Sequence, residues 1–240
     1  MNGEKRLSAS MPKLCVALDV DLEAARRLLG ELSDLPLVFK VGPGALLEGG
    51  LSLPRMIKEL GRELFLDLKL HDIPNTVSLA VQRAEELGVD YLTLHTIGGE
   101  EMLRAAVSVR RRTKLIGVTL LTSHGGDLLR LLRMNFQDPA EVVVHLARLA
   151  RRAGLDGVVC SAAEVRRVKE ETSLITVVPG VRISERRDDQ VRVSTPQFAV
   201  REGADLIVMG RDVYRSDNPR RTVERLLEVL GEEGASEGAF

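Results

Sequence analysis

The chain has 240 residues, of which 29% are charged and 44% hydrophobic, and its formal net charge is −1. This length suits one large domain or two small ones, and the near-neutral charge excludes a global attraction to nucleic acid or to a membrane. No run of 18 apolar residues and no apolar stretch near the start is present, so we expect neither a membrane span nor a signal peptide. Cys15 and Cys160 lie inside apolar runs, which favours buried thiols and a cytoplasmic location.

Eight short apolar segments rich in Val, Ile and Leu predict strands that are buried on both faces. They are residues 14–19, 37–42, 64–70, 91–95, 115–121, 157–161, 174–180 and 206–210. Segments with helical periodicity alternate with them, at residues 21–32, 75–88, 99–112, 140–154, 162–172, 195–203 and 218–231. Several of these helices end in Gly, and in three cases an Asp then leads into the next strand, at Asp90, Asp156 and Asp205.

The alternation of strand and helix predicts a parallel sheet with right-handed crossovers. Eight such units in about 220 residues fit a (β/α)8 TIM barrel more economically than an open, doubly wound sheet, which is the alternative. We expect a flexible N-terminus at residues 1–11, a single barrel domain at residues 12–231 and a disordered tail at residues 232–240. The tail is expected because its Gly- and Glu-rich sequence has no periodicity.

A group of charged residues interrupts the apolar strands. The stretch "FLDLKLHDIPNT" at residues 65–76 contains Asp67, Lys69 and, in the turn after the strand, Asp72, while Lys40 lies in the preceding strand. Residues two apart on a strand face the same side, so Asp67 and Lys69 are expected to lie together, within reach of Lys40. Isolated buried charges are costly, so the group indicates either a structural ion-pair network or a preorganised site with an ammonium ready to donate a proton. We favour the second interpretation.

Other candidates lie at the ends of the predicted strands, where barrel enzymes place their functional residues. They are Asp19, His95, Thr122, Ser123, Arg182, Gly210 and Arg211. Arg182 follows the seventh strand, and Gly210 and Arg211 follow the eighth, which is where such barrels often bind phosphate. No spacing of His, Cys and carboxylates matches a metal site, and no Gly-x-Gly-x-x-Gly or P-loop pattern occurs. We therefore predict a phosphate site and no metal.

The sequence resembles the orotidine 5′-phosphate decarboxylase family. The resemblance rests on "DLKLHDIPNT", on "KVG" before it, and on "LTS", "DGVVCSA", "PGVR", "DDQVRVSTP" and "GRDV" after it, in the order of the family. It covers roughly residues 13–220. The Asp-x-Lys-x-x-Asp core alone is shared with metal-dependent sugar-phosphate relatives, whereas "LHDIPNT" and "DDQ-x-R-x-x-TP" are more specific.

The resemblance implies a (β/α)8 barrel that forms a homodimer with active sites at the subunit interface. It implies conversion of orotidine 5′-phosphate to UMP and carbon dioxide, the last step of de novo pyrimidine synthesis, without metal or organic cofactor. In that reaction Lys69 protonates C6, Asp67 lies close to the departing carboxylate, and Lys40 contacts the ribose and Asp67. Asp72 and Thr76 reach into the partner's site.

The resemblance also assigns the substrate contacts. Asp19 binds the ribose, and Thr122 binds the pyrimidine ring. The phosphate end consists of Arg182, Gln190, Gly210 and Arg211. Residues 124–143 and the bulky Ile97 depart from the family pattern.

Two other functions are weighed against this one. A metal-dependent decarboxylase or aldolase acting on a sugar phosphate needs an additional carboxylate near Asp67, and the neighbouring strand ends supply only Lys40 and His95. A nucleotide-binding protein without activity is expected to have lost one of the two lysines, and both Lys40 and Lys69 are present.

Overall fold

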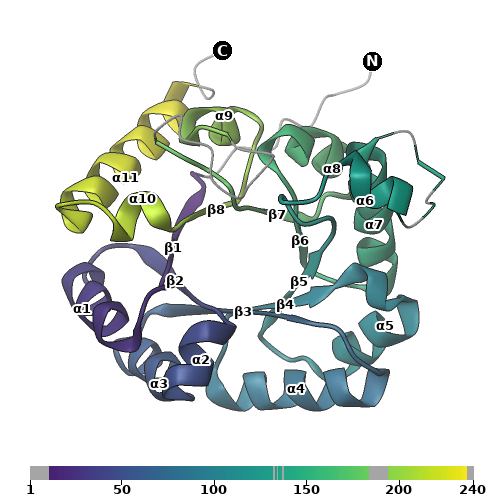
Figure 1. Ribbon diagram of the computed structural model, residues 1–240, viewed down its shortest axis with the longest axis horizontal. Coiled ribbons are helices and arrows are strands. Elements are labelled where there is room, and N and C mark those ends of the chain that lie inside the picture. The colour runs from purple at the N-terminus through teal and green to yellow at the C-terminus, as the bar shows by residue number, and fades with distance from the viewer. Residues whose placement is uncertain (1–10, 132, 134, 137, 184–193, 237–240) are drawn as a thin grey trace, which may run out of the picture.

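The computed structural model describes residues 11–131, 133, 135–136, 138–183 and 194–236. Within them, eight parallel strands close into a barrel in chain order, and helices surround it (Figure 1). The strands are β1 (Lys13–Ala17), β2 (Leu37–Val41), β3 (Glu63–Leu70), β4 (Tyr91–His95), β5 (Lys114–Val118), β6 (Gly157–Val159), β7 (Ile175–Val178) and β8 (Leu206–Met209). The predicted barrel and all eight predicted strands are confirmed, and the open sheet is excluded.

The helices of the outer layer connect these strands. They are α1 (Leu22–Leu32), α2 (Pro43–Gly49), α3 (Ser52–Glu59), α4 (Pro74–Leu87), α5 (Glu100–Val109), α6 (Gly126–Leu131), α7 (Pro139–Ala153), α8 (Val165–Thr172), α9 (Pro196–Arg201), α10 (Arg211–Tyr214) and α11 (Pro219–Ser236), with short 3-10 turns at η1 (Thr96–Gly98) and η2 (Ala162–Glu164). In the part of the chain that the structure describes, no helix has both the length and the apolar character needed to cross a membrane.

The helical layer contains four short helices that were not predicted, α2, α3, α6 and α10, and its last helix is longer than expected. No helix was predicted between the second and third strands, where the structure has α2 and α3, each only seven or eight residues long. Such short helices contain too few turns to show a clear period in the sequence. At the other end, α11 continues to Ser236, five residues beyond the expected end of the barrel domain at residue 231. The Glu and Ala residues of this stretch have good helix propensity, which outweighs the missing apolar period.

The core has two layers, one inside the barrel and one between the barrel and the helices. The interior side chains are Cys15, Ala17, Val38, Phe65, Tyr91, Ile116, Val177, Leu206 and Val208. Along three neighbouring strands the same period of two continues upward from this layer to a polar residue. Lys40 follows Val38, Asp67 follows Phe65, and Thr93 follows Tyr91. The barrel is therefore apolar in its middle and polar at the C-terminal ends of its strands.

At the opposite, N-terminal end of the barrel, the same hydrogen-bonding arrangement occurs three times, around the carboxylates of Asp90, Asp156 and Asp205. The predicted Gly stops before them are confirmed, since Gly88, Gly154 and Gly203 all have positive φ, a conformation that glycine adopts most readily. Each carboxylate accepts hydrogen bonds from a backbone N–H of the preceding strand and from a basic side chain. The donors are Leu64 and Lys58 for Asp90, Leu115 and Arg110 for Asp156, and Thr176 and Lys169 for Asp205, at 2.6–2.9 Å.

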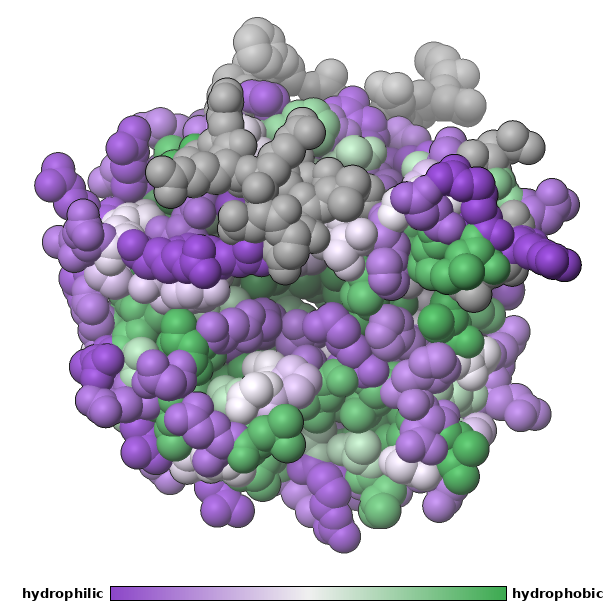
Figure 2. Space-filling view, in the orientation of Figure 1, coloured by the Kyte–Doolittle hydropathy of each residue, from purple (hydrophilic) through white to green (hydrophobic). Residues whose placement is uncertain are grey.

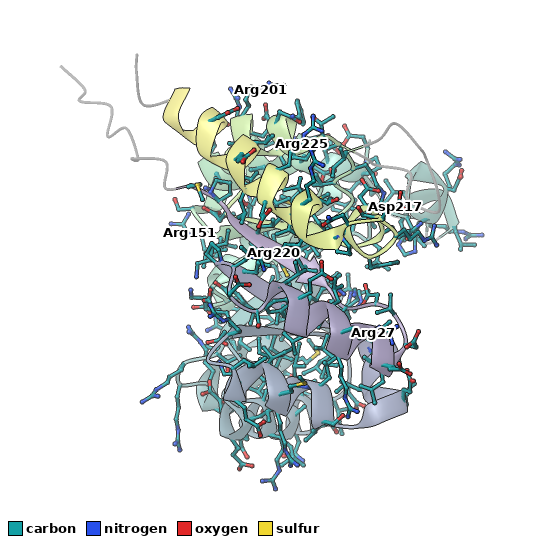
Figure 3. The ribbon with its side chains drawn as sticks, turned by 90° about the vertical axis from the view of Figure 1, so that its left-hand side faces the viewer. Arg27, Arg151, Arg201, Asp217, Arg220 and Arg225 are labelled. Carbon is teal, nitrogen blue, oxygen red and sulfur yellow. The ribbon has the colours of Figure 1, made fainter. Side chains whose placement is uncertain are left out.

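The ring of helices closes where α11 lies beside α1 (Figure 3). Arg220 of α11 donates two hydrogen bonds of 2.8 Å to the carboxylate of Asp34, which follows α1, and a third of 3.0 Å to the carbonyl oxygen of Glu31. The guanidinium lowers the pKa of Asp34 to about 2. A bidentate Arg–carboxylate pair of this kind fixes orientation more than it adds free energy at an exposed site.

Candidate active site

A cavity of about 380 Å3 opens at the C-terminal end of the barrel. Figure 2 shows a hollow at the centre of this face, with hydrophilic side chains along its border. Of the eleven residues to which the family resemblance assigns a role, eight line the cavity. They are Asp19, Lys40, Asp67, Lys69, Thr122, Arg182, Gly210 and Arg211. Residues that are far apart in the sequence meet here because parallel strands bring all their C-terminal ends to one side of the barrel.

Four alternating charges cross one wall of the cavity. The Lys69 ammonium lies 2.8 Å from Oδ2 of Asp67, and the Lys40 ammonium lies 3.3 Å from the same oxygen. Lys40 also lies 3.1 Å from both carboxylate oxygens of Asp19. The order is therefore Asp19, Lys40, Asp67, Lys69. We call these four side chains the charge chain.

Burial varies along the charge chain. The side chains of Lys40 and Asp67 are only 10% and 15% exposed, whereas that of Lys69 is 37% exposed. Burial alone would raise the pKa of Asp67, but the ammonium groups of Lys40 and Lys69 hold that pKa below its ordinary value. Burial alone would likewise lower the pKa of Lys40, but Asp67 and Asp19 raise it. Both residues are therefore charged at neutral pH, and Lys69 is the more open of the two ammonium groups.

A bulge in β3 places Asp67 and Lys69. Between Leu66 and Leu70 this strand advances four residues, while the paired residues of β4, Leu92 and Leu94, advance only two. Lys69 has φ of +50°, in the left-handed region that non-glycine residues rarely adopt. Asp67 and Lys69 meet as predicted, but in a bulged strand and not in a regular one. Bulges of this kind are frequent beside active sites because they re-aim side chains.

Thr93 of β4 faces this bulge and was not predicted as a site residue. Its Oγ1 accepts a hydrogen bond of 2.8 Å from the backbone N–H of Lys69 and donates one of 3.0 Å to Oδ1 of Asp67. The side chain is fully buried. Only the ends of the strands were searched for candidates, whereas Thr93 lies in the middle of "YLTLH". The sequence did carry one signal for Thr93, which is its position on the interior face of the strand, two residues after Tyr91 and two before His95.

The other side of the cavity carries the residues expected to bind phosphate. Arg182, only 6% exposed, follows β7, while Gly210 and Arg211 lie at the junction of β8 with the short helix α10. Thr122, which follows β5, lines the cavity together with Leu121 and Ser123. The cationic groups are thus divided between two places, with lysines on β2 and β3 and arginines after β7 and β8.

Two predicted site residues that the structure describes, Asp72 and Thr76, do not line the cavity. Asp72 is exposed, and its Oδ1 accepts a 2.7 Å hydrogen bond from the backbone N–H of Ile73. Thr76 is exposed on the first turn of α4. Gln190 lies outside the described residues. Within one chain, Asp19 and not Asp72 supplies the fourth charge next to the lysines.

Two histidines lie near the charge chain. The rings of His71 and His95 have centroids 5.8 Å apart, and no hydrogen-bond partner for the buried Nδ1 of His95 occurs among the described residues. Burial, then the nearby His71 and Lys69, lower the pKa of His95. Across the same residues, no three His, Cys, Asp or Glu side chains are grouped so that they could hold a metal ion.

The fold and the site together define an enzyme of the TIM-barrel class, with a charged cavity at the C-terminal ends of the strands. Residues 12–226 match the model of the family described as "Orotidine 5′-phosphate decarboxylase / HUMPS family". An orotidine 5′-phosphate decarboxylase of Aquifex aeolicus (strain VF5) is 46% identical over 230 residues, which cover 92% of this chain and 100% of that protein. The chain therefore belongs to the orotidine 5′-phosphate decarboxylase / HUMPS family.

Further relatives agree with this membership. An orotidine 5′-phosphate decarboxylase of Legionella pneumophila (strain Paris) is 45% identical over 231 residues, covering 91% of this chain and 99% of that protein. A crystal structure of orotidine 5′-phosphate decarboxylase from Lactobacillus acidophilus matches with a TM-score of 0.80 and 31% identity, covering 92% of this chain and 99% of that one. Sequence and structure thus point to the same group of proteins over nearly the whole chain.

Proposed function

We propose that this protein is an orotidine 5′-phosphate decarboxylase, which converts orotidine 5′-phosphate to UMP and carbon dioxide and so completes de novo pyrimidine synthesis. The observation that carries the proposal is the charge chain, with the Lys69 ammonium 2.8 Å from Asp67 at the edge of a cavity. Family membership narrows the substrate, since the relatives named above are orotidine 5′-phosphate decarboxylases.

The reaction breaks the bond between C6 of the pyrimidine ring and its carboxylate. Carbon dioxide leaves, and the electron pair of that bond remains on C6, where no adjacent π-system absorbs it. The Lys69 ammonium stabilises this developing charge and then donates its proton to C6, and water returns a proton to the amine. Asp67 forms an ion pair with the Lys69 ammonium and lies next to the departing carboxylate, so no cofactor is needed in this proposal.

The remaining substrate contacts are proposed from the residues that line the cavity and from the family resemblance. We propose that Arg182, Gly210 and Arg211 bind the phosphate and that Asp19 and Lys40 bind the ribose. Thr122 then contacts the ring, and Gln190 completes the phosphate end. The lysines lie on β2 and β3 whereas the two arginines follow β7 and β8, and this separation along the cavity wall supports the orientation. Binding energy from the distant phosphate is available to hold the ring against Lys69, so a substrate without phosphate is expected to lose turnover as well as affinity.

We also propose a homodimer in which Asp72 and Thr76 contribute to the partner's site. Support comes from their exposure on this chain and from the neighbouring Ile73, which is 66% exposed. An apolar side chain of this exposure beside an exposed carboxylate suits an interface between copies. Both cysteines are buried and outside any disulfide, which supports a reducing, cytoplasmic compartment.

Mixing two inactive variants tests the shared site. Asp72→Asn and Lys69→Ala are each expected to be inactive alone. Refolded together at equal amounts, half of the dimers are mixed, and each mixed dimer has one intact site, so about a quarter of wild-type activity should return. No recovery from a mixture that elutes as a dimer in size-exclusion chromatography would contradict the assignment of Asp72.

The function itself is tested by ultraviolet absorbance, following loss of orotidine 5′-phosphate with purified protein, with and without a metal chelator. Rapid conversion to UMP that the chelator does not affect supports the proposal. Activity that appears only with magnesium and another sugar phosphate would move the protein to a different branch of its family. A folded protein that binds UMP without any turnover would indicate a nucleotide-binding protein that lacks catalysis.

A further inference from the structure

We propose that Thr93 is a positioning residue of the decarboxylase site, whose hydroxyl fixes the β3 bulge and the Asp67 carboxylate at the same time. This inference rests on the proposed function. One oxygen atom, Oγ1, receives the N–H of Lys69 and donates to Oδ1 of Asp67. This oxygen is therefore hydrogen-bonded to the backbone of Lys69 and to the side chain of Asp67, which are neighbours in the charge chain.

The backbone contact explains how a strained residue is held. The register shift between β3 and β4 interrupts the regular pairing of the two strands at Lys69. A buried N–H without a partner costs free energy, and the left-handed φ of Lys69 adds backbone strain. The Thr93 hydroxyl gives this N–H an acceptor at 2.8 Å. The bulge that aims the Lys69 ammonium thus depends on one side chain from the next strand.

The side-chain contact fixes the carboxylate. Both ammonium groups lie on Oδ2 of Asp67, at 2.8 and 3.3 Å, and Thr93 donates to the other oxygen, Oδ1. The three contacts together define the plane of the carboxylate, because its two oxygens are held from different sides. An Asp67 free to rotate about its last side-chain bond would present Oδ2 to Lys69 only part of the time. Thr93 does not line the cavity, so its effect passes through Asp67 and Lys69.

The variant Thr93→Val removes the hydroxyl and keeps the shape of the side chain. We expect kcat to fall about 10- to 100-fold, the range for losing a hydrogen bond to a charged group. We expect KM to change less than about threefold, because the substrate contacts remain. Thr93→Ser keeps the hydroxyl and should retain kcat within about threefold of wild type. If Thr93→Ser is as impaired as Thr93→Val, packing of the methyl group matters and the hydroxyl does not, and the proposal is wrong.

The pH profile separates positioning from mere stability. The ionisable groups around Asp67 are Asp19 and Cys15 from β1 and the loop after it, Lys40 from β2, Lys69 from β3 and His95 from β4. Loss of a donor to the ionised carboxylate raises the pKa of Asp67, so the acid limb of kcat/KM should move to higher pH by about half a unit to one unit. An unchanged profile with unchanged kcat in folded Thr93→Val would overturn the proposal.

Thr176 offers a matched control at the other end of the barrel. It is also a fully buried strand threonine, and its Oγ1 donates to an aspartate oxygen, Oδ2 of Asp205, at 3.0 Å. Thr176→Val should lower the thermal midpoint yet leave kcat and the pH profile unchanged. If Thr176→Val moves the acid limb as Thr93→Val does, the shift reports general loosening of the barrel and the proposal fails.

Two further measurements keep the test decisive. If Thr93→Val does not fold, Thr93→Cys replaces it, since a thiol is only a weak donor. An intermediate loss of kcat with the same direction of pH shift is expected, and an unchanged enzyme contradicts the proposal. If the wild-type protein has no decarboxylase activity, the proposed function fails first. Carbon-13 NMR titration of the Asp67 carboxyl, assigned with Asp67→Asn, then still shows whether Thr93→Val raises its pKa as the geometry requires.

Discussion

The two ends of the barrel differ in how their charged side chains are arranged. At the N-terminal end, Asp90, Asp156 and Asp205 each take one basic side chain and one backbone N–H, so every carboxylate is satisfied locally. At the C-terminal end, one oxygen of Asp67 is shared by two ammonium groups, in a wall of four charges. Buried ion pairs seldom add net stability. The concentration of charge at the C-terminal end is therefore explained by the reaction, whereas the separate carboxylates of the N-terminal end are explained by folding.

This contrast predicts that the same substitution has different consequences at the two ends. Lys69→Ala removes the proposed proton donor and the charge beside C6, so activity should fall about 10,000-fold or more, while substrate still binds. Lys58→Ala removes the partner of Asp90, 2.6 Å away, at the other end. It should leave kcat within about twofold and cost about 1 kcal/mol of unfolding free energy.

Steady-state kinetics and thermal unfolding of both variants check this pair. Near-normal turnover of Lys69→Ala would remove Lys69 from the mechanism. A large loss of kcat in folded Lys58→Ala would instead show that a change at the N-terminal end alters catalysis at the C-terminal end. The division of roles between the two ends would then be wrong.

A second prediction concerns stability alone. Asp205→Ala takes the acceptor away from the N–H and hydroxyl of Thr176 and leaves Lys169 without its partner at 2.8 Å. Buried donors left unsatisfied make this one of the more damaging changes outside the site, at about 2–4 kcal/mol. Chemical denaturation measures the loss. The kcat of the folded fraction should match wild type, and a lower value at full folding would contradict the division between the two ends.

The sequence allowed much of this arrangement to be predicted, for identifiable reasons. Strands that are buried on both faces appear in the sequence as apolar runs. The barrel could therefore be predicted, and so could the lysine and aspartate residues that interrupt those runs. The three carboxylates of the N-terminal end follow Gly stops, so their repetition was also visible. In both cases the relevant residues either lie close together in the chain or differ in type from the residues around them.

The parts that could not be predicted depend on geometry between strands. The bulge at Asp67 and Lys69 arises from the register of β3 against β4, which local sequence does not encode. Thr93 was missed for the same reason, because a threonine in a strand is ordinary until its neighbour is bulged. Asp72 was expected next to the lysines because it is near them in sequence, yet the turn points it away, and Asp19 from a distant segment takes that place.

The smallest predicted effect is at Glu85 of α4, again toward the N-terminal end. Its Oε1 accepts hydrogen bonds of 2.7–3.0 Å from the backbone N–H groups of Arg111, Arg112 and Thr113, in the loop that leads into β5. Burial alone would raise the pKa of Glu85, but these three donors together hold that pKa below its ordinary value. The lowered pKa means that the folded state holds the ionised form more tightly than the unfolded chain does.

Glu85→Gln removes this charge and keeps an oxygen acceptor. The stabilisation from Glu85 is present above the pKa of an unfolded glutamate, about 4.3, and is lost as the pH falls through the lower folded value. Wild type should therefore exceed Glu85→Gln in unfolding free energy by less than about 1 kcal/mol at pH 7, since the site is only partly buried, and the difference should vanish in acid. Glu86→Gln, whose partner is the exposed Arg83 at 2.8 Å, is the control and should stay close to wild type at all pH values. A difference for Glu85→Gln that persists or grows at low pH would show that the lost acceptor geometry, and not the charge, supports the loop.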